Sequence, residues 1–253
     1  MSVLFVTGSS RGIGRELVRA ADGFAVTVVH GRDLDRLEPL VAELRGRGRD
    51  VLPVAGDLTV ADEAAALVDA VHRRTGRIDV LVNNAAATAV ENIEAATDIT
   101  TARWNQVLAL NLTAPFLLSR AVHPIMAGHG GGHIVNVGSY AGTAGFHGLA
   151  PYSATKAGLV ALSQTLSAEW ASAGVRVNTV ILGPVVPDEL APESAVGAVA
   201  RGFCWRRDVV RVLAGLAQDL GSTLTGAVLH LDGGAFVADL DTSVRKVKEG
   251  LNR

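Results

Sequence analysis

The chain has 253 residues, 49 % of them apolar, so it is long and apolar enough to bury a sizeable core. A net charge of −2 without a dense Lys/Arg cluster argues against nucleic acid as a partner, and no apolar run reaches the ~18 residues that span a bilayer. The single cysteine, Cys204, fits a reducing compartment, and a strand-like run begins at Val3 without a basic leader, so we expect a soluble, cytoplasmic protein.

Short β-rich runs alternate with longer helical patterns along the chain. The strand-like runs are mostly continuously apolar, which is typical of a parallel sheet covered on both faces. They are Val3–Thr7, Ala25–His30, Val51–Ala55, Ile78–Asn83, His133–Gly138, Val175–Ile181 and Ala227–Leu231. The helical segments are Gly12–Ala21, Asp33–Arg47, Val60–Thr75, Thr101–Met126, Ala150–Ala173 and Arg206–Leu220. This order predicts a single-domain, doubly wound α/β fold: a seven-stranded parallel sheet with right-handed crossovers and helices on both faces.

Two regions depart from this alternation. Residues 183–205 contain three prolines, so we expect an irregular loop that covers a substrate site. The domain should span residues 1–235. The tail at 236–253 has apolar residues at alternating spacings of three and four, which suits an amphipathic helix against the body or a partner subunit. A frayed tail is the alternative.

A lone cation marks the candidate catalytic segment. Between Arg120 and Arg176 the only Lys or Arg is Lys156, which comes four residues after Tyr152. Positions i and i+4 share one face of a helix, so the ammonium can reach the phenol. A nearby positive charge favours the ionised phenol, and would lower its pKa from about 10 so that it serves as an acid or base near neutral pH. The alternative is an ordinary helix with a packed Tyr and a solvated Lys.

A glycine cluster follows the first predicted strand and opens the first predicted helix. Glycines there allow a tight turn and close approach of the backbone to a pyrophosphate, while the helix amino terminus offers unpaired N–H groups. A turn without a ligand is the alternative reading. The predicted contacts with a dinucleotide are Gly8, Ser10, Arg11, Gly12, Ile13 and Gly14.

These motifs, together with Asp57, Asn83-Asn84-Ala85, Asn111 and Ser139 in that order, resemble the short-chain dehydrogenase/reductase family over about Val3 to Gly234. The resemblance implies a Rossmann-type NAD(P)-binding fold. It also implies an oxidoreductase that transfers a hydride between nicotinamide and a ketone or secondary alcohol. A homodimer or homotetramer is expected on the same ground.

The resemblance implies a role for each of four residues. Tyr152 would act as the general acid or base, and Lys156 would lower its pKa and bind the nicotinamide ribose. Ser139 would hold the substrate oxygen. Asn111 would hold a water that links Lys156 to solvent, or else be a satisfied core amide. No metal is required, and the histidines show no ligand-like spacing.

The resemblance also implies that Asp57, Leu58, Asn84 and Ala85 contact the adenosine, and that Gly183 and Val185 lie near the nicotinamide. A carboxylate at the end of the second strand would favour NAD and repel a 2′-phosphate. Here that strand ends without an acid before Asp33, and both Arg11 and Arg32 can offer charge-assisted bonds to a phosphate. We therefore expect NADP(H) rather than NAD(H), unless these arginines are merely solvated.

The sequence departs from the family pattern at Pro187, where a threonine that binds the carboxamide is expected. Nicotinamide binding would then be weaker or use another donor. The first helix also looks about two residues shorter than usual. The expected walls of the substrate pocket are mostly apolar, which suits a small or medium apolar ketone or alcohol. They are Tyr140, Phe146, His147, Leu149, Val186 and Leu190.

Two other functions remain open at this point. The chain could retain the cofactor for a biosynthetic step without net redox, of the dehydratase or epimerase type. It could also be a catalytically silent NADP(H)-binding scaffold or sensor, a reading motivated by Pro187. Acyl groups on a carrier protein are disfavoured as substrates by the scarcity of Lys and Arg over residues 121–175, although Arg201, Arg206 and Arg207 leave a basic docking surface possible.

Overall fold

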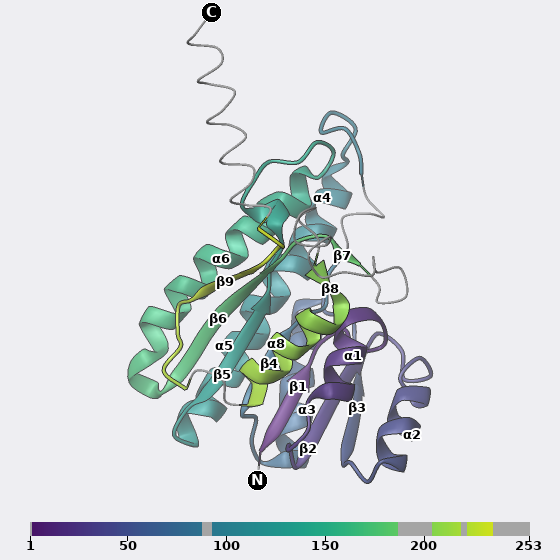
Figure 1. Cartoon of the computed structure of the whole chain (residues 1–253), viewed down its shortest axis with the longest axis vertical. Coiled ribbons are helices and arrows are strands. Elements are labelled where there is room, and N and C mark those ends of the chain that lie inside the picture. The colour runs from purple at the N-terminus through teal and green to yellow at the C-terminus, as the bar shows by residue number, and fades with distance from the viewer. Residues whose placement is uncertain (1, 88–92, 187–203, 219–221, 235–253) are drawn as a thin grey trace, which may run out of the picture.

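The computed structural model describes residues 2–87, 93–186, 204–218 and 222–234, which form one parallel sheet with helices on both sides (Figure 1). The strand order is β3-β2-β1-β4-β5-β6-β9, and every neighbouring pair is parallel. This confirms the predicted doubly wound, seven-stranded sheet, with strand boundaries within two residues of those expected. The strands are β1 Val3–Val6, β2 Val26–Gly31, β3 Val51–Ala55, β4 Val80–Asn83, β5 Gly132–Val137, β6 Val175–Leu182 and β9 Val228–Leu231.

The helices follow the predicted order with two corrections. They are α1 Gly12–Ala20, α2 Glu38–Gly46, α3 Ala61–Thr75, α4 Thr101–Leu108, α5 Ala114–Gly128, α6 Ala150–Trp170 and α8 Arg206–Gln218, with 3₁₀ turns at Tyr140–Gly142 and Ala171–Ala173. The single helix predicted over Thr101–Met126 is wrong, because a π-helical segment, Ala109–Thr113, separates α4 from α5. No helix in the described ranges has both the length and the apolarity to cross a membrane.

Helix α2 also begins later than predicted, at Glu38 rather than Asp33. The Asp33 side chain accepts a hydrogen bond from the N–H of Asp35, which turns the chain before the helix begins. A proline in the first turn of α2 then suits the helix start, because its missing N–H would have no partner there.

Each face of the sheet has its own apolar core. Leu4 and Val6 of β1 pack with α1, α2 and α8, whereas Val3 and Phe5 pack with α3, α5 and α6 (Figure 1). Successive side chains of a strand point to opposite faces, so continuously apolar strands serve both cores. The chain therefore runs from β1 outward through β2 and β3, and then returns to build β4, β5, β6 and β9 on the other side. In open sheets of this kind, ligands bind at the carboxyl ends of the strands where the direction of winding changes, here between β1 and β4.

The segment predicted as an irregular loop at 183–205 is ordered at its two ends. Val185–Val186 forms β7, which pairs in parallel with β8, Cys204–Trp205. Val185 and Cys204 pack against the core that contains α1 and α8, which explains why these ends form strands. Residues 187–203, with Pro187 and Leu190, and the tail at 236–253 lie outside the described residues.

Arg49 completes the carboxyl end of the short helix α1. Its guanidinium donates hydrogen bonds to the carbonyl oxygens of Val18 and Ala21 and, at 2.8 Å, to Thr27 Oγ1. Only 14 % of the Arg49 side chain is exposed. The last carbonyl groups of a helix have no hydrogen-bond donor within the helix, and Arg49 supplies the missing donors at the end of α1.

We predict that Arg49→Leu lowers the free energy of unfolding by about 2 kcal/mol, because it removes charged donors and leaves buried carbonyl groups without partners. Urea denaturation measures the change. Arg47→Leu is the control, since the Arg47 side chain is 56 % exposed and, among the described residues, forms an ion pair only with Glu43 on the same helical face. A loss in Arg49→Leu no larger than that of the control would contradict the capping role.

Candidate active site

A cavity of about 1100 Å³ lies at the carboxyl ends of the strands. It brings together most of the predicted catalytic and cofactor residues, which come from seven separate segments of the chain. These lining residues are Gly8, Ser10, Arg11, Gly12, Ile13, Arg32, Asp57, Leu58, Asn84, Ala85, Ser139, Tyr152, Lys156, Gly183 and Val185. Gly14 and Asn111 do not line the cavity. Its volume of about 1100 Å³ slightly exceeds the ~300–1,000 Å³ usual for small-molecule sites, which leaves room for a ligand as large as a dinucleotide.

The glycine loop forms an open cradle at the start of α1. Gly8 and Gly12 have φ angles of 65° and 59°, a backbone conformation that favours glycine. A Cβ on Gly8 would lie 2.8 Å from Ala85 Cα, and one on Gly14 would lie 2.5 Å from Asn84 Nδ2, so side chains are excluded at both positions. A Cβ on Gly12 would meet nothing within 4 Å, which leaves open space beside the helix amino terminus. The residues present therefore fit a dinucleotide diphosphate.

Asn84 holds this loop in place as well as lining the cavity. Its Nδ2 donates to the carbonyl oxygens of Thr7 and Gly8, at 2.9 and 3.1 Å. In return, Thr7 Oγ1 accepts from the N–H groups of Asn84 and Ala85, at 3.0 and 3.1 Å. The loops that follow β1 and β4 are thus fixed to each other.

His30, which the sequence analysis did not single out as a site residue, links the glycine loop to the loop after β3. Its Nδ1 accepts from the N–H of Gly8 at 3.2 Å, and its Nε2 lies 3.2 Å from the carbonyl oxygen of Gly56. These partners require a neutral ring protonated on Nε2. Burial lowers the pKa of His30, which favours that neutral form.

Arginine dominates the charged lining of the described cavity. The arginines are Arg11, Arg32, Arg36, Arg103 and Arg206. The first two were predicted as cofactor contacts, and the last three were not. Asp57 faces this cluster with its pKa held down by two hydrogen bonds from Thr59 and by the charge of Arg32. A cavity with this excess of positive charge suits a polyanionic ligand.

Ser139 and Tyr152 meet at the end of β5. Ser139 Oγ accepts from the N–H of Ala141, and the Ser139 side chain also shares a hydrogen bond with Tyr152. Burial raises the pKa of Tyr152 above its ordinary value, and the bond with Ser139 offsets this only partly. The predicted lowering of the Tyr152 pKa by Lys156 is therefore not found, because desolvation outweighs the other influences. The phenol is held in its neutral form, which is a proton donor.

Lys156 is buried on the same face of α6. Its Nζ donates to the carbonyl oxygen of Val137 at 2.8 Å and lies 5.7 Å from the centroid of the Tyr152 ring. Burial lowers the pKa of Lys156 to about 8. The ammonium is therefore mainly charged at neutral pH but is held by a backbone carbonyl rather than by the phenol oxygen.

Asn111 lies in the π-helical segment and is 1 % exposed. Its Oδ1 accepts from the N–H of Ala87 at 2.8 Å, and its Nδ2 lies within 3.5 Å of the Ala87 carbonyl and of Thr155 Oγ1. Asn111 thus joins the loop after β4 to the helix that carries Lys156. Such π-helical interruptions are frequent at functional sites. The role of Asn111 in holding a water stays a prediction.

Four predicted substrate contacts lie between β5 and α6 but do not line this cavity: Tyr140, Phe146, His147 and Leu149. Tyr140 is buried and packs edge-on against Phe146, with ring centroids 5.3 Å apart. Val186 lies on β7 beside the cavity-lining Val185, and Leu190 is not among the described residues. Their contact with a substrate stays a prediction.

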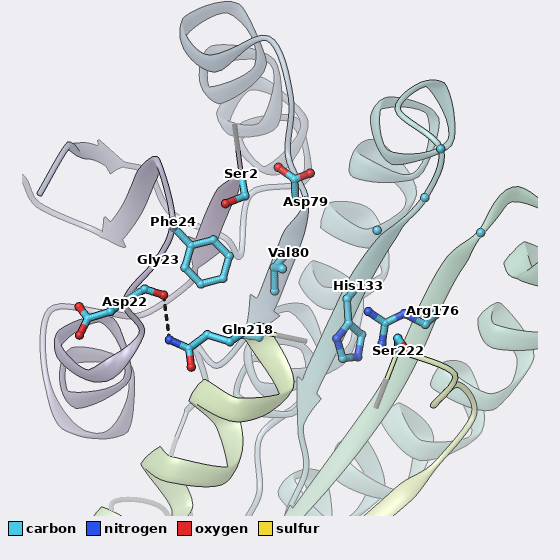
Figure 2. A pocket seen from close by; sticks show the side chains of 15 residues that line it. Ser2, Asp22, Gly23, Phe24, Asp79, Val80, His133, Arg176, Gln218 and Ser222 are labelled. Atoms are coloured by element: carbon cyan, nitrogen blue, oxygen red, sulfur yellow. Dashed lines mark hydrogen bonds between the residues drawn. The ribbon is translucent and has the colours of Figure 1, made fainter. Parts of the chain in front are cut away.

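A second cavity, of about 630 Å³, lies at the opposite edge of the sheet, where the strands begin (Figure 2). Two of its polar side chains already serve the fold. Asp79 accepts from the N–H of Val3 at 2.7 Å, while His133 bonds to the Leu216 carbonyl and to Asn178. Burial lowers the pKa of His133 to about 4, so the ring is neutral. We assign no chemistry to this cavity.

Comparisons with known proteins agree with this fold. The model of the short chain dehydrogenase family matches residues 2–195. The chain is similar to the 3-oxoacyl-[acyl-carrier-protein] reductase FabG of Staphylococcus aureus (strain Mu50), with 32 % identity over 241 residues that cover 92 % of this chain and 97 % of that protein.

Two solved structures share the fold. One is a short-chain type dehydrogenase/reductase from Mycobacterium ulcerans, with a TM-score of 0.83, 28 % identity, and coverage of 93 % of this chain and 90 % of that chain. The other is a blue fluorescent protein from a metagenomic library in complex with NADPH, with a TM-score of 0.80, 30 % identity, and coverage of 92 % and 97 %.

Acid should weaken the hydrogen bond that holds the glycine loop, because protonated His30 Nδ1 can no longer accept from the N–H of Gly8. Because burial lowers the pKa of His30, the unfolded chain takes up a proton first, near pH 6.5. The stability contributed by the neutral ring is fully present above about pH 6.5 and is lost as the pH falls through the folded-state pKa. Urea denaturation between about pH 7.5 and about pH 5 should therefore show a shallower decline for His30→Gln than for the wild type. His129 is exposed, and His129→Gln serves as the control: the free energy of unfolding should decline with falling pH as steeply as in the wild type. The same decline in His30→Gln would contradict the role given to neutral His30.

Proposed function

Because the chain belongs to the short-chain dehydrogenase/reductase family, we propose that it is an NADP(H)-dependent reductase of ketones that also oxidises the corresponding secondary alcohols. The bound dinucleotide supplies or accepts the hydride. The observation that carries the proposal is the meeting of Ser139, Tyr152 and Lys156 in one cavity with the glycine loop. An inactive scaffold would not need a protonated phenol beside a second hydroxyl in that cavity.

The preference for NADP(H) rests on the adenosine end of the cavity. Strand β2 ends at Gly31 without a carboxylate that would oppose a 2′-phosphate. Asp33, which follows Arg32, also lines the cavity, and its Oδ1 accepts a hydrogen bond from the N–H of Asp35. Arg32 and Arg36 line the cavity and have no hydrogen bond or ion pair within the described part of the chain, so both are available to a phosphate. The NADPH complex of a similar protein supports the same preference. Asp57, Leu58 and Ala85 would surround the adenine.

The side chains supply the proton and hold the substrate. Tyr152, kept neutral by burial, donates its proton to the carbonyl oxygen of the ketone, and Ser139 donates a hydrogen bond to the same oxygen. The charge of Lys156 stabilises the phenolate that remains. In the direction of oxidation, the phenolate takes the alcohol proton back. Asn111 bonds to Thr155, which lies between Tyr152 and Lys156 on α6, and so holds the helix turn that carries both residues.

The substrate that we propose is a small or medium apolar ketone. A 3-oxoacyl group on a carrier protein is the second candidate, and the named activity of the similar Staphylococcus protein favours it. Residues 121–175 carry only one Lys and no Arg, which argues against docking of an acidic carrier there. Comparing kcat/KM for a free ketone with that for a carrier-bound 3-oxoacyl group separates the two.

We predict that Tyr152→Phe lowers kcat for ketone reduction by about 100-fold or more, because it removes the proton donor. The dissociation constant for NADPH should change little, and it serves as the control for folding. NADPH oxidation with a panel of ketones, followed by product analysis, measures the effect. Unchanged turnover would contradict the role of Tyr152, and turnover without net NADPH oxidation would favour an epimerase or dehydratase.

We also predict that Arg32→Ala raises the dissociation constant for NADP⁺ by about 10-fold or more, because a charge-assisted bond to the 2′-phosphate is lost. The constant for NAD⁺ should change far less. Titration of protein fluorescence measures both constants. Arg73→Ala is the control, since Arg73 lies exposed in the last turn of α3 and does not line the cavity. Equal weakening of the two dinucleotides would contradict the assignment.

A further inference from the structure

Arg206 has no function in the site as described so far. It is the first residue of α8, is half-buried, and lines the same cavity as Gly12, Ile13 and Val185. It has no hydrogen bond or ion pair with any described residue. A half-buried guanidinium keeps its charge, so it needs an anionic partner or solvent.

The packing of α8 places Arg206 near the start of α1. Val209, one turn into α8, belongs to the same apolar core as Cys204, and Ile13 and Val185 pack against that core. Helix α8 itself packs along α1 (Figure 1). The first turn of α8 is therefore anchored to the wall of the cavity that holds the glycine loop, and Arg206 reaches it from a different segment of the chain.

Arg206 enters the cavity from a different segment than the arginines proposed to bind the 2′-phosphate. Arg32 directly follows β2, whereas Arg206 begins α8, which packs on α1. Gln218, at the end of α8, donates to the carbonyl oxygen of Asp22 just beyond the end of α1, so the two helices run in the same direction and begin at the same end. The anionic group expected beside Arg206 is therefore the one held at the start of α1.

We propose that Arg206 binds the diphosphate of the dinucleotide, together with the backbone N–H groups at the start of α1, which come from a different segment of the chain. The inference rests on the proposed cofactor and deepens it. Arginine presents a planar set of donors that matches two phosphate oxygens. The next residue, Arg207, differs: it is exposed, and its guanidinium lies 4.8 Å from the centroid of the Trp205 ring.

Two fragments of the cofactor test the proposal by binding alone. ADP-ribose contains the diphosphate but no 2′-phosphate, whereas adenosine 2′-monophosphate contains the 2′-phosphate and no phosphate at the 5′ position. Arg206→Ala should raise the dissociation constants for NADP⁺ and ADP-ribose by about 10-fold and change that for adenosine 2′-monophosphate by less than about 3-fold. Arg32→Ala should weaken NADP⁺ and adenosine 2′-monophosphate but not ADP-ribose. Arg206→Lys should restore part of the loss, and Arg207→Ala should match the wild type.

Equal weakening of both fragments in Arg206→Ala, or no weakening of either, would overturn the proposal. An unchanged affinity for ADP-ribose with a raised KM for an anionic ketone would also overturn it and would assign Arg206 to the substrate. Failure of the wild type to bind NADP⁺ and both fragments would instead reject the proposed cofactor, and the role of Arg206 with it. Calorimetric titration and thermal unfolding of each variant separate lost binding from lost folding.

Discussion

The hydrogen bond from Lys156 to Val137 is the contact on which the catalytic cluster depends. A buried ammonium is unfavourable unless a partner compensates the lost water, so the bond from Nζ to the last carbonyl of β5 sets how α6 lies against the sheet. Tyr152, one turn earlier on α6, is thereby brought to Ser139 just beyond β5. Gly142 permits this approach, since a Cβ there would lie 2.6 Å from the backbone of Lys156.

The rest of this edge of the sheet is organised in the same way, by directional polar contacts between segments far apart in the chain. Asn84 ties the loop after β4 to Thr7, and His30 ties the glycine loop to the loop after β3. Asn111 ties the loop after β4 to α6. Apolar burial holds the layers together but is non-directional, whereas these hydrogen bonds fix the orientation of each loop. The polar groups that line the cavity are thereby held in fixed orientations, which favours electrostatic catalysis.

The positions of the strands along the chain, the glycine loop and the placement of Tyr152 and Lys156 on one helix could be predicted because local sequence encodes each of them. The break between α4 and α5 could not, since it involves a bond from Asn111 to the loop after β4, 24 residues away. The four-residue spacing of Tyr152 and Lys156 correctly predicted that the two side chains lie close together on α6. It could not reveal that burial raises the pKa of the Tyr152 phenol, which the hydrogen bond with Ser139 lowers only in part, because desolvation depends on everything packed around the ring.

The central claim is that the neutral phenol of Tyr152 gives its proton to a ketone oxygen beside a bound dinucleotide. A crystal structure of the protein with NADP⁺ and an unreactive ketone tests it most directly. The expected result is a ketone oxygen about 2.6–3.2 Å from both Tyr152 Oη and Ser139 Oγ. A ketone oxygen held by other groups, with the phenol turned out of reach, would contradict it.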